Sequence, residues 1–278
     1  MIISDTSALV LNFTSPDIWK SKNARVYFDK LDLSSADDLL KMFDEEELYM
    51  QTQLVSNRKY FVRKKIIEFL EKNNSQNHSA QVIILAAGIA PLSVEIASLF
   101  PTCKVFDIDK YQMQDKNKFL DNLCPNIQFI EVDITDLQGL TTKLTALGWN
   151  EHEPSLLVME GIIYYISEND LKSIFNKFAP VAGLIGDFCL KPEWVNEKTR
   201  KFGVDVFRKI KETTGVKYTN FYDPLHFTGL LKKCGFSNPE IITMNLIQFE
   251  RTGKLAPFNN DDSGWIILIS SSYIGKTN

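Results

Sequence analysis

Residues 81–110 constrain the fold more than any other part of this sequence. They read QVIILAAGIAPLSVEIASLFPTCKVFDIDK. The apolar run over 82–87 is unbroken, which is typical of a strand buried on both faces of a parallel sheet. A helical apolar pattern follows over 92–99, and a second short strand is expected at 104–109. Because parallel neighbours need a crossover connection, the stretch predicts a βαβ unit.

The alternation of strand and helix continues along the rest of the chain. Further apolar runs that would form strands occur at residues 127–132, 155–160, 181–190, 240–249 and 265–270. Helical patterns lie between most of these runs, which is typical of a sheet with helices on both faces. We therefore expect an α/β fold with a doubly wound, mostly parallel, seven-stranded sheet. The last two strands would form an antiparallel pair at one edge.

Charge and composition narrow the classes of partner. The 278 residues include 31 basic and 35 acidic side chains, and this net charge of −4 disfavours a nucleic-acid partner. No apolar run approaches the roughly 20 residues of a membrane span, and the first residues lack the basic region of a signal peptide. The four cysteines and three histidines do not pair at zinc-ligand spacing. We therefore expect a cytoplasmic protein without a zinc site.

Three of the expected parallel strands end at an acidic residue. Asp109, Asp133 and Glu160 each follow an apolar run. Ligands of open α/β sheets bind beyond the carboxyl ends of the strands, so these carboxylates should converge on one crevice. Carboxylates gathered in a cleft repel one another unless something positive is bound there, and the pattern therefore favours a cationic ligand or a metal ion.

The turn after the first strand limits which nucleotide-like ligand can bind. It reads AAGIAP over 86–91, so Gly88 is the one glycine where a dinucleotide site would carry G-x-G-x-x-G. Pro91 also removes a backbone N–H that a pyrophosphate could use. A nicotinamide-dependent enzyme is disfavoured and a P-loop is excluded. A nucleoside without phosphates and with a cationic end fits better, and S-adenosylmethionine (SAM) has that layout.

Five segments in order, Y-F-V-R, I-I-L-A-A-G, V-F-D-I-D, F-I-E-V-D-I-T-D and L-L-V-M-E-G-I-I-Y-Y-I, resemble class I SAM-dependent methyltransferases. Within that class the chain is most similar to the leucine carboxyl methyltransferase-like O-methyltransferases. The most specific match is E-G-I-I-Y-Y-I at 160–166, against the family's E-G-x-L-x-Y-L. The family's first turn reads G-x-G-x-D-x-R, and this chain departs from it with Ala86, Ala90 and Leu92.

The resemblance implies a Rossmann-like fold and assigns cofactor contacts near the first two strands. Arg63 would bind the carboxylate of SAM, which suits a bidentate guanidinium. The backbone at Ala87 and Gly88 would approach the methionine part. Asp109 would accept hydrogen bonds from the ribose hydroxyls, with Asp107 the second choice.

Further contacts are implied at the following strands. Asp133 and the backbone of Ile134 would recognise adenine, and Glu160 would lie near the amino group or the sulfonium. Tyr165 would face the reacting atoms. His226, at the start of an expected helix, is the second candidate for a catalytic base or hydrogen-bonding group.

We expect a single domain over 1–278, in which the aromatic segments at 1–50 and 191–222 form a lid that either encloses an acceptor site or only packs on the sheet. Residues 1–50 would form an N-terminal helical lid, 51–190 the SAM-binding core, 191–222 a lid and acceptor insertion, and 223–278 the remaining part of the sheet. Aromatic residues of the two lid segments would line an acceptor pocket: Phe13, Trp19, Trp194, Phe202, Phe207, Tyr218, Phe221 and Tyr222.

The implied reaction is O-methylation of a carboxylate or hydroxyl on a small molecule or peptide, by in-line displacement at the methyl group. A carboxylate acceptor needs no base, whereas a hydroxyl does. No metal ion is implied. The alternative is a methyltransferase-like protein without catalysis that serves in binding or assembly, and the altered first turn is the feature that favours it.

Overall fold

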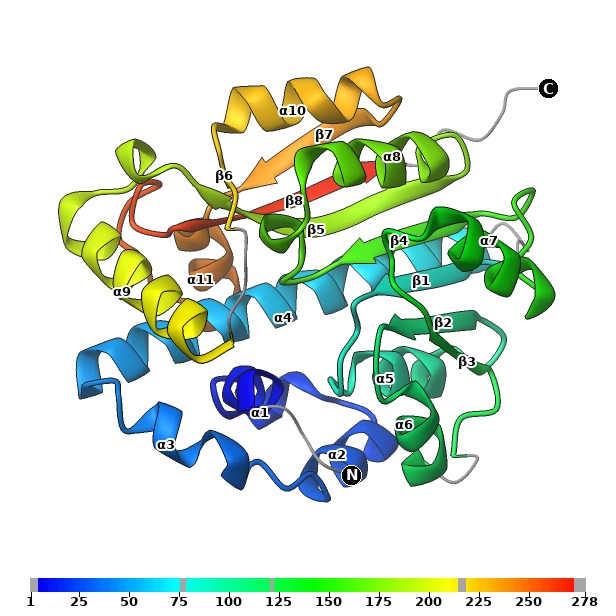
Figure 1. Ribbon diagram of the computed structural model, residues 1–278, viewed down its shortest axis with the longest axis horizontal. Coiled ribbons are helices and arrows are strands. Elements are labelled where there is room, and N and C mark those ends of the chain that lie inside the picture. The colour runs from blue at the N-terminus through cyan, green and yellow to red at the C-terminus, as the bar shows by residue number, and fades with distance from the viewer. Residues whose placement is uncertain (1–4, 76–78, 121–122, 215–218, 273–278) are drawn as a thin grey trace.

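The computed structural model describes residues 5–75, 79–120, 123–214 and 219–272, and it contains one mixed sheet with helices on both faces (Figure 1). The strand order is β3-β2-β1-β4-β5-β8-β7, and a short strand β6 pairs with β5 off this path. The strands are β1 Gln81–Leu85, β2 Lys104–Asp109, β3 Ile127–Glu131, β4 Ser155–Met159, β5 Ala182–Leu190, β6 Phe221–Tyr222, β7 Ser237–Ile242 and β8 Ile266–Ser272.

The pairing confirms the doubly wound, mostly parallel sheet. Strands β1 to β5 pair in parallel, and β8 lies antiparallel between β5 and β7. Six of the seven strands of the main path lie where the sequence predicts them, β7 overlaps the expected strand 240–249 only over Glu240–Ile242, and β6 is an additional pair of residues. The order reverses between β1 and β4, so the crevice of a doubly wound sheet is expected beside these two strands.

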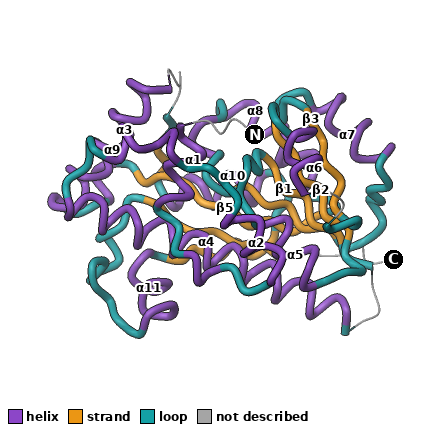
Figure 2. Tube along the Cα trace, turned by 90° about the horizontal axis from the view of Figure 1, so that it is seen from below, coloured by secondary structure: helices purple, strands orange, loops and turns teal. Residues whose placement is uncertain are grey.

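The α-helices are α1 Asp5–Asn12, α2 Lys22–Asp29, α3 Asp37–Leu40, α4 Glu45–Asn74, α5 Leu92–Leu99, α6 Met113–Leu120, α7 Leu137–Ala146, α8 Glu168–Phe178, α9 Glu197–Thr214, α10 Pro224–Lys233 and α11 Met244–Thr252. Figure 2 shows α4 and α5 on one side of the sheet, and α7 and α8 on the other. No described helix has both the length and the apolar composition that crossing a membrane requires.

One expected strand is wrong over most of its length. The run 240–249 was assigned to a strand, but β7 ends at Ile242 and α11 begins at Met244. Met244, Ile247 and Gln248 are buried at helical spacing, which places one face of α11 on the protein. The helix ends at Gly253, whose φ of +72° suits a left-handed C-terminal residue.

The long helix α4 begins at a run of acidic residues, Asp44-Glu45-Glu46-Glu47. Asp44 caps its first turn by accepting from the Glu47 backbone N–H, and the Glu47 side chain accepts in return from Asp44. Glu47 is also buried and lies 2.9 Å from Lys209 of α9. The run therefore serves as a helix cap and as a contact between α4 and α9.

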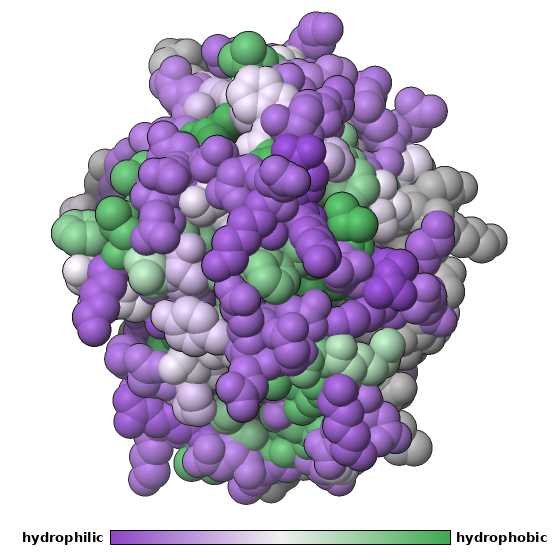
Figure 3. Space-filling view, turned by 90° about the vertical axis from the view of Figure 1, so that its left-hand side faces the viewer, coloured by the Kyte–Doolittle hydropathy of each residue, from purple (hydrophilic) through white to green (hydrophobic). Residues whose placement is uncertain are grey.

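The N-terminal helix α1 and the insertion helix α9 lie beyond the carboxyl ends of the central strands (Figure 1). Both contribute residues to the same cavity as the turn after β1. The outer face on the α9 side carries hydrophilic side chains interspersed with smaller apolar groups (Figure 3). One helix from each of the two expected lid segments thus lies at the end of the sheet where a ligand would bind.

Candidate active site

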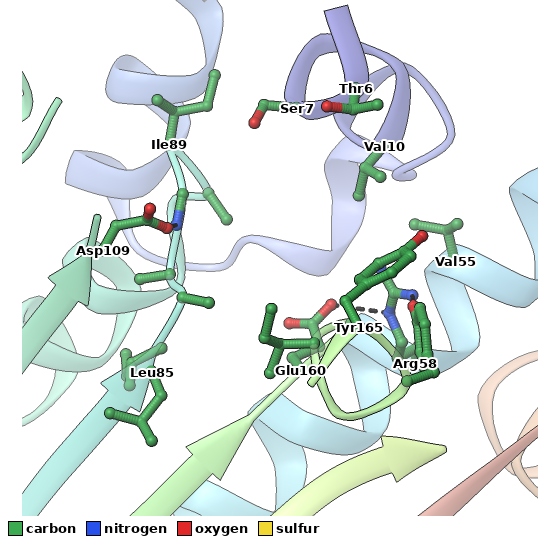
Figure 4. Close-up of a pocket in the computed structure, with 18 of the residues that line it drawn as sticks. Thr6, Ser7, Val10, Val55, Arg58, Leu85, Ile89, Asp109, Glu160 and Tyr165 are labelled. Atoms are coloured by element: carbon green, nitrogen blue, oxygen red, sulfur yellow. Dashed lines mark hydrogen bonds and ion pairs between the residues drawn. The ribbon is translucent and has the colours of Figure 1, made fainter. Parts of the chain in front are cut away.

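A cavity of about 1000 Å³ lies at the carboxyl ends of β1, β2 and β4. Its walls come from α1, α4 and α9 together with the loops that follow β1, β2, β3 and β4. Figure 4 shows Thr6, Ser7 and Val10 of α1 across the cavity from Glu160 and Leu85. The structure therefore contains a crevice at the strand ends, where the sequence predicts one.

The turn after β1 follows the path of a glycine-containing turn. Gly88 has a φ of +54°, and Ala86 has a φ of +53°, which is the left-handed region that a non-glycine residue rarely occupies. The Gly88 N–H donates to Asp109 Oδ2 at 2.8 Å. Ala86, Ala87 and Gly88 all line the cavity. The backbone at residue 86 thus has the left-handed conformation typical of glycine although the residue is alanine, and it is locally strained.

The two carboxylates of β2 lie in different environments. Asp109 lines the cavity and accepts from the backbone N–H groups of Gly88 and Lys110. Burial raises the pKa of Asp109, and these backbone hydrogen bonds oppose the rise. Asp107 is fully buried and lies 2.7 Å from Lys116 Nζ, outside the cavity lining. The geometry favours Asp109 over Asp107 as a ligand group.

The adenine candidates line the cavity beyond β3. Asp133 accepts from the Thr135 backbone N–H at 3.0 Å and lies 3.0 Å from Lys110 Nζ. The hydrogen bonds from Thr135, with the one from Lys110, lower the pKa of Asp133 to about 2. Ile134 is buried beside it and also lines the cavity.

Glu160 at the end of β4 is buried between two cations. Arg58 Nε lies 3.0 Å and Lys59 Nζ 2.8 Å from Glu160 Oε1, and both cations come from α4 (Figure 4 shows the Arg58 contact). Burial alone would raise the pKa of Glu160, but the Lys59 and Arg58 charges outweigh it and hold it below its ordinary value. Glu160, Asp133 and Asp109 all have hydrogen-bond or ion-pair partners within the protein. Repulsion between these carboxylates is therefore not a reason to expect a cationic ligand.

Arg58 and Lys59 are site residues that the sequence reasoning missed. Both line the cavity, and Arg58 Nη1 donates to the Tyr164 hydroxyl at 3.3 Å. Leu54, Arg58 and Phe61 share one buried face of α4 at helical spacing. That spacing was the available signal, because it places Arg58 on the same stripe as the apolar residues.

Asp187 of β5 completes this buried charge cluster. Its Oδ1 accepts from the Gly161 backbone N–H at 2.7 Å, and its Oδ2 lies 3.9 Å from Arg58 Nη1. Burial raises the pKa of Asp187 to about 6, against the opposing charge of Arg58. Asp187 therefore connects the loop after β4 to the cation of α4.

Arg63 does not lie in the cavity, contrary to the expectation that it binds the SAM carboxylate. Its Nε lies 2.6 Å from Glu95 Oε1, at the start of α5. Glu95 is fully buried and also accepts from the backbone N–H groups of Lys20 and Ser21. Arg63 thus compensates a buried carboxylate that fixes the N-terminal segment to α5.

The two catalytic candidates are placed very differently. Tyr165 lies in a short 3₁₀ turn, Ile163–Tyr165, lines the cavity, and packs against Tyr164 with ring centroids 4.5 Å apart. Burial raises the pKa of its phenol. His226 is exposed in the first turn of α10 and outside the cavity lining, with its Nε2 3.7 Å from Glu168. The structure therefore brings Tyr165 to the site and not His226.

Some of the lid aromatics reach the cavity and others do not. Phe13 and Phe207 line it, whereas Trp19 is buried elsewhere and Trp194 is exposed. Tyr218 lies outside the described residues. Within the described part of the chain, no group of three or more His, Cys, Asp or Glu side chains is placed to hold a metal ion.

Comparison with known proteins decides the family. A family model described as leucine carboxyl methyltransferase matches residues 8–179. The chain belongs to the leucine carboxyl methyltransferase family. This confirms the resemblance found in the sequence, and SAM is the cofactor of the methyltransferases to which the family belongs. A search of curated proteins finds no match.

Solved structures support the fold. A DUF574 family protein from Streptomyces avermitilis aligns with a TM-score of 0.64 at 12% identity, covering 94% of this chain and 100% of its own. A candidate methyltransferase from Thermobifida fusca aligns with a TM-score of 0.62 at 15% identity, covering 93% of this chain and 97% of its own. At these identities the likeness concerns the fold alone.

The residues that line the cavity fit SAM. The positive φ values at Ala86 and Gly88 give the turn the backbone course that close approach of a ligand needs. Asp109 supplies a carboxylate beside the turn after β1, and the cations Arg58 and Lys59 lie on the α4 side of the same cavity. The cavity therefore offers groups of suitable charge for both ends of the cofactor.

Proposed function

We propose that this protein transfers the methyl group of SAM to a carboxylate oxygen of a small-molecule or peptide acceptor. The observation that carries the proposal is the set of ionisable groups around the cavity. No histidine lines it among the described residues, Tyr165 holds its proton at neutral pH, and Glu160 is paired with two cations. A carboxylate acceptor is already ionised at neutral pH and needs no base.

Three ionisable groups around Arg58 are paired or hold their proton at neutral pH. Burial raises the pKa of Tyr165, so its phenol stays protonated at neutral pH. Glu160 is paired with two cations, which lower its pKa and weaken it as a base. Burial lowers the pKa of Lys59, and its Nζ is paired with Glu160 Oε1 at 2.8 Å.

The binding roles follow from where each side chain lies. Asp109 would accept hydrogen bonds from the ribose, and Asp133 with the backbone of Ile134 would hold the adenine. Arg58 and Lys59, in place of Arg63, would face the carboxylate of the cofactor or of the acceptor. When bound, SAM supplies an electrophilic methyl group on sulfur. The residues of this chain hold the acceptor oxygen in line with it and exclude water.

The apolar wall of the cavity points to an acceptor with an apolar body. Helix α1 contributes Leu9 and Val10, α4 contributes Val55, and α9 contributes Val206 and Phe207. Of these side chains, Val10 and Val55 lie across the cavity from Asp109 in Figure 4. The lid segments 1–50 and 191–222 would therefore enclose the acceptor.

The experiment is methyl transfer from SAM labelled in its methyl group, with organic acids and their matched alcohols as acceptors. A methyl ester releases volatile labelled methanol in mild alkali, whereas a methyl ether does not. We expect alkali-labile product from the acids. Alkali-stable product from the alcohols would show hydroxyl methylation instead.

Tyr165→Phe separates the two mechanisms further. The variant keeps the ring that packs on Tyr164 and removes the only group it could use as an acid or base. With a carboxylate acceptor, kcat should stay within about tenfold of the wild type, because loss of a general base typically costs 10²–10⁴-fold. A larger loss would contradict a base-free reaction.

The alternative of a binding or assembly protein without catalysis is tested by calorimetric titration with SAM and S-adenosylhomocysteine. The altered turn at Ala86 is the feature that favours it. Binding without turnover of any acceptor class would support that alternative, and absence of binding would contradict the proposed function.

A further inference from the structure

In the turn after β1, residues 86–91, three consecutive carbonyls accept hydrogen bonds from side chains outside the turn. Lys116 Nζ of α6 donates to the carbonyls of Gly88 at 3.0 Å and Ala90 at 3.1 Å. The Tyr27 hydroxyl of α2 donates to the carbonyl of Ile89 at 2.9 Å. The turn is thus fixed from two sides by helices distant in the sequence.

The position of the Lys116 ammonium leaves little freedom. Lys116 and Asp107 are both fully buried, and Lys116 Nζ lies 2.7 Å from Asp107 Oδ2. An ammonium has three N–H donors, and here the three are directed to Gly88, Ala90 and Asp107. The Ser93 hydroxyl donates to the same oxygen of Asp107 and restrains the carboxylate in turn.

The energetics suggest a role other than overall stability. A buried ion pair is costly to desolvate, and an apolar pair of similar volume often stabilises a fold as well or better. What an apolar pair cannot supply is directed donors for two turn carbonyls. The Lys116–Asp107 pair therefore contributes mainly by directing N–H donors to the turn carbonyls, and less by stabilising the fold.

The turn over 86–91 has no polar side chain of its own. Where the family pattern has Asp and Arg, this chain has Ala90 and Leu92, and Leu92 is buried. The turn cannot hold itself through its own side chains. Its carbonyls instead receive donors from α6 and α2.

Tyr27 connects this arrangement to the N-terminal segment. Its side chain is buried and its ring packs edge-on against Phe119 of α6 at 5.7 Å between centroids. The helix that carries Tyr27 therefore contacts both the turn and α6. The same N-terminal segment supplies α1, which also lines the cavity.

We propose that Lys116 and Tyr27 are positioning residues that hold the turn 86–91 in its SAM-binding conformation. The inference rests on the proposed use of this cavity for SAM. Because the Gly88 N–H donates to Asp109, a shift of the turn also moves the partner of the ribose-binding carboxylate. Loss of either donor should therefore weaken the cofactor without touching it directly.

The test uses two variants of the full chain and a matched control. Tyr27→Phe removes one hydroxyl and keeps the ring. The double variant Lys116→Met with Asp107→Asn removes both charges together, so that no buried carboxylate is left unpaired. Lys118→Met, on an exposed position of the same helix α6, is the control.

Two measurements are made on each folded variant: the Kd for SAM by calorimetry, and amide hydrogen exchange of the turn without SAM. We expect the Kd to rise at least tenfold in the double variant and about threefold in Tyr27→Phe. The amides of Ala87 and Gly88 should exchange faster in both. The Lys118→Met control should match the wild type in both measurements.

The outcomes separate this inference from the proposed function. If the wild type binds SAM and the folded variants bind it within twofold of the wild type, the positioning role is wrong while the function stands. A lower melting temperature with unchanged Kd and exchange would likewise show a merely structural role. If the wild type does not bind SAM, the proposed function is wrong, and the cofactor role of Lys116 and Tyr27 is overturned with it.

Discussion

Replacing Ala86 by glycine should stabilise this protein, although it removes a methyl group. Ala86 has a φ of +53°, and an L-residue pays roughly 1–2 kcal/mol for the left-handed region. Glycine adopts this φ freely but loses about 0.5–1 kcal/mol more backbone entropy on folding. The expected net gain in the free energy of unfolding is therefore ~0.5–1 kcal/mol.

The reciprocal change in the same turn is the matched control. Gly88 has a φ of +54°, and a methyl group there would meet only Ser7 Oγ within 4 Å, at an ordinary 3.8 Å. Gly88→Ala therefore tests backbone strain without a steric clash. It should destabilise the protein by about the amount that Ala86→Gly stabilises it, ~0.5–1 kcal/mol.

The assay is equilibrium urea unfolding together with calorimetric melting. For a chain of this length the melting temperature should rise by about 1–3 °C in Ala86→Gly and fall by a similar amount in Gly88→Ala. The Kd for SAM should not increase in Ala86→Gly. A lower stability of Ala86→Gly, or shifts of the same sign in both variants, would refute the strain at Ala86.

Three further outcomes are expected. SAM at 100 times its Kd should add ~2.7 kcal/mol to the stability, measured as a thermal shift that an unrelated nucleoside does not give. Asp109→Asn should weaken SAM roughly tenfold to a hundredfold in calorimetry, because hydrogen bonds to a charged group contribute about 1.5–3 kcal/mol. The pKa of Asp187 is raised from 3.8 to about 6, so its protonation favours folding at acid pH. That contribution, ~3 kcal/mol, is lost as the pH rises through 6, and urea titrations at pH 4 and pH 7.5 should show Asp187→Asn losing this pH dependence.

The turn after β1 shows which features of a site a local sequence pattern can predict. Its single glycine and Pro91 are visible in the sequence and disfavour a pyrophosphate ligand. The left-handed φ at Ala86 is not visible there, because alanine gives no signal of that conformation. The donors from Lys116 and Tyr27 are also hidden, since they come from helices far away in the chain.

Helix α4 shows the same division. Its Y-F-V-R segment was readable in the sequence, and the family resemblance pointed to Arg63 as the cofactor ligand. The choice between Arg58 and Arg63 depends on which helix turn lies against β4 and which against α5. Helical period fixes the relative directions of side chains within one element, but the partner on each side is set by packing.

The sequence by itself determined the sheet, its family, and the strand-end carboxylates Asp109, Asp133 and Glu160. These features depend on local apolar runs and on short motifs, so they survive without knowledge of distant contacts. The tertiary structure decided that each carboxylate already has a partner, that His226 lies outside the cavity and that Arg58 lies within it. Charge pairing and burial join residues far apart in the chain, and only the folded arrangement specifies them.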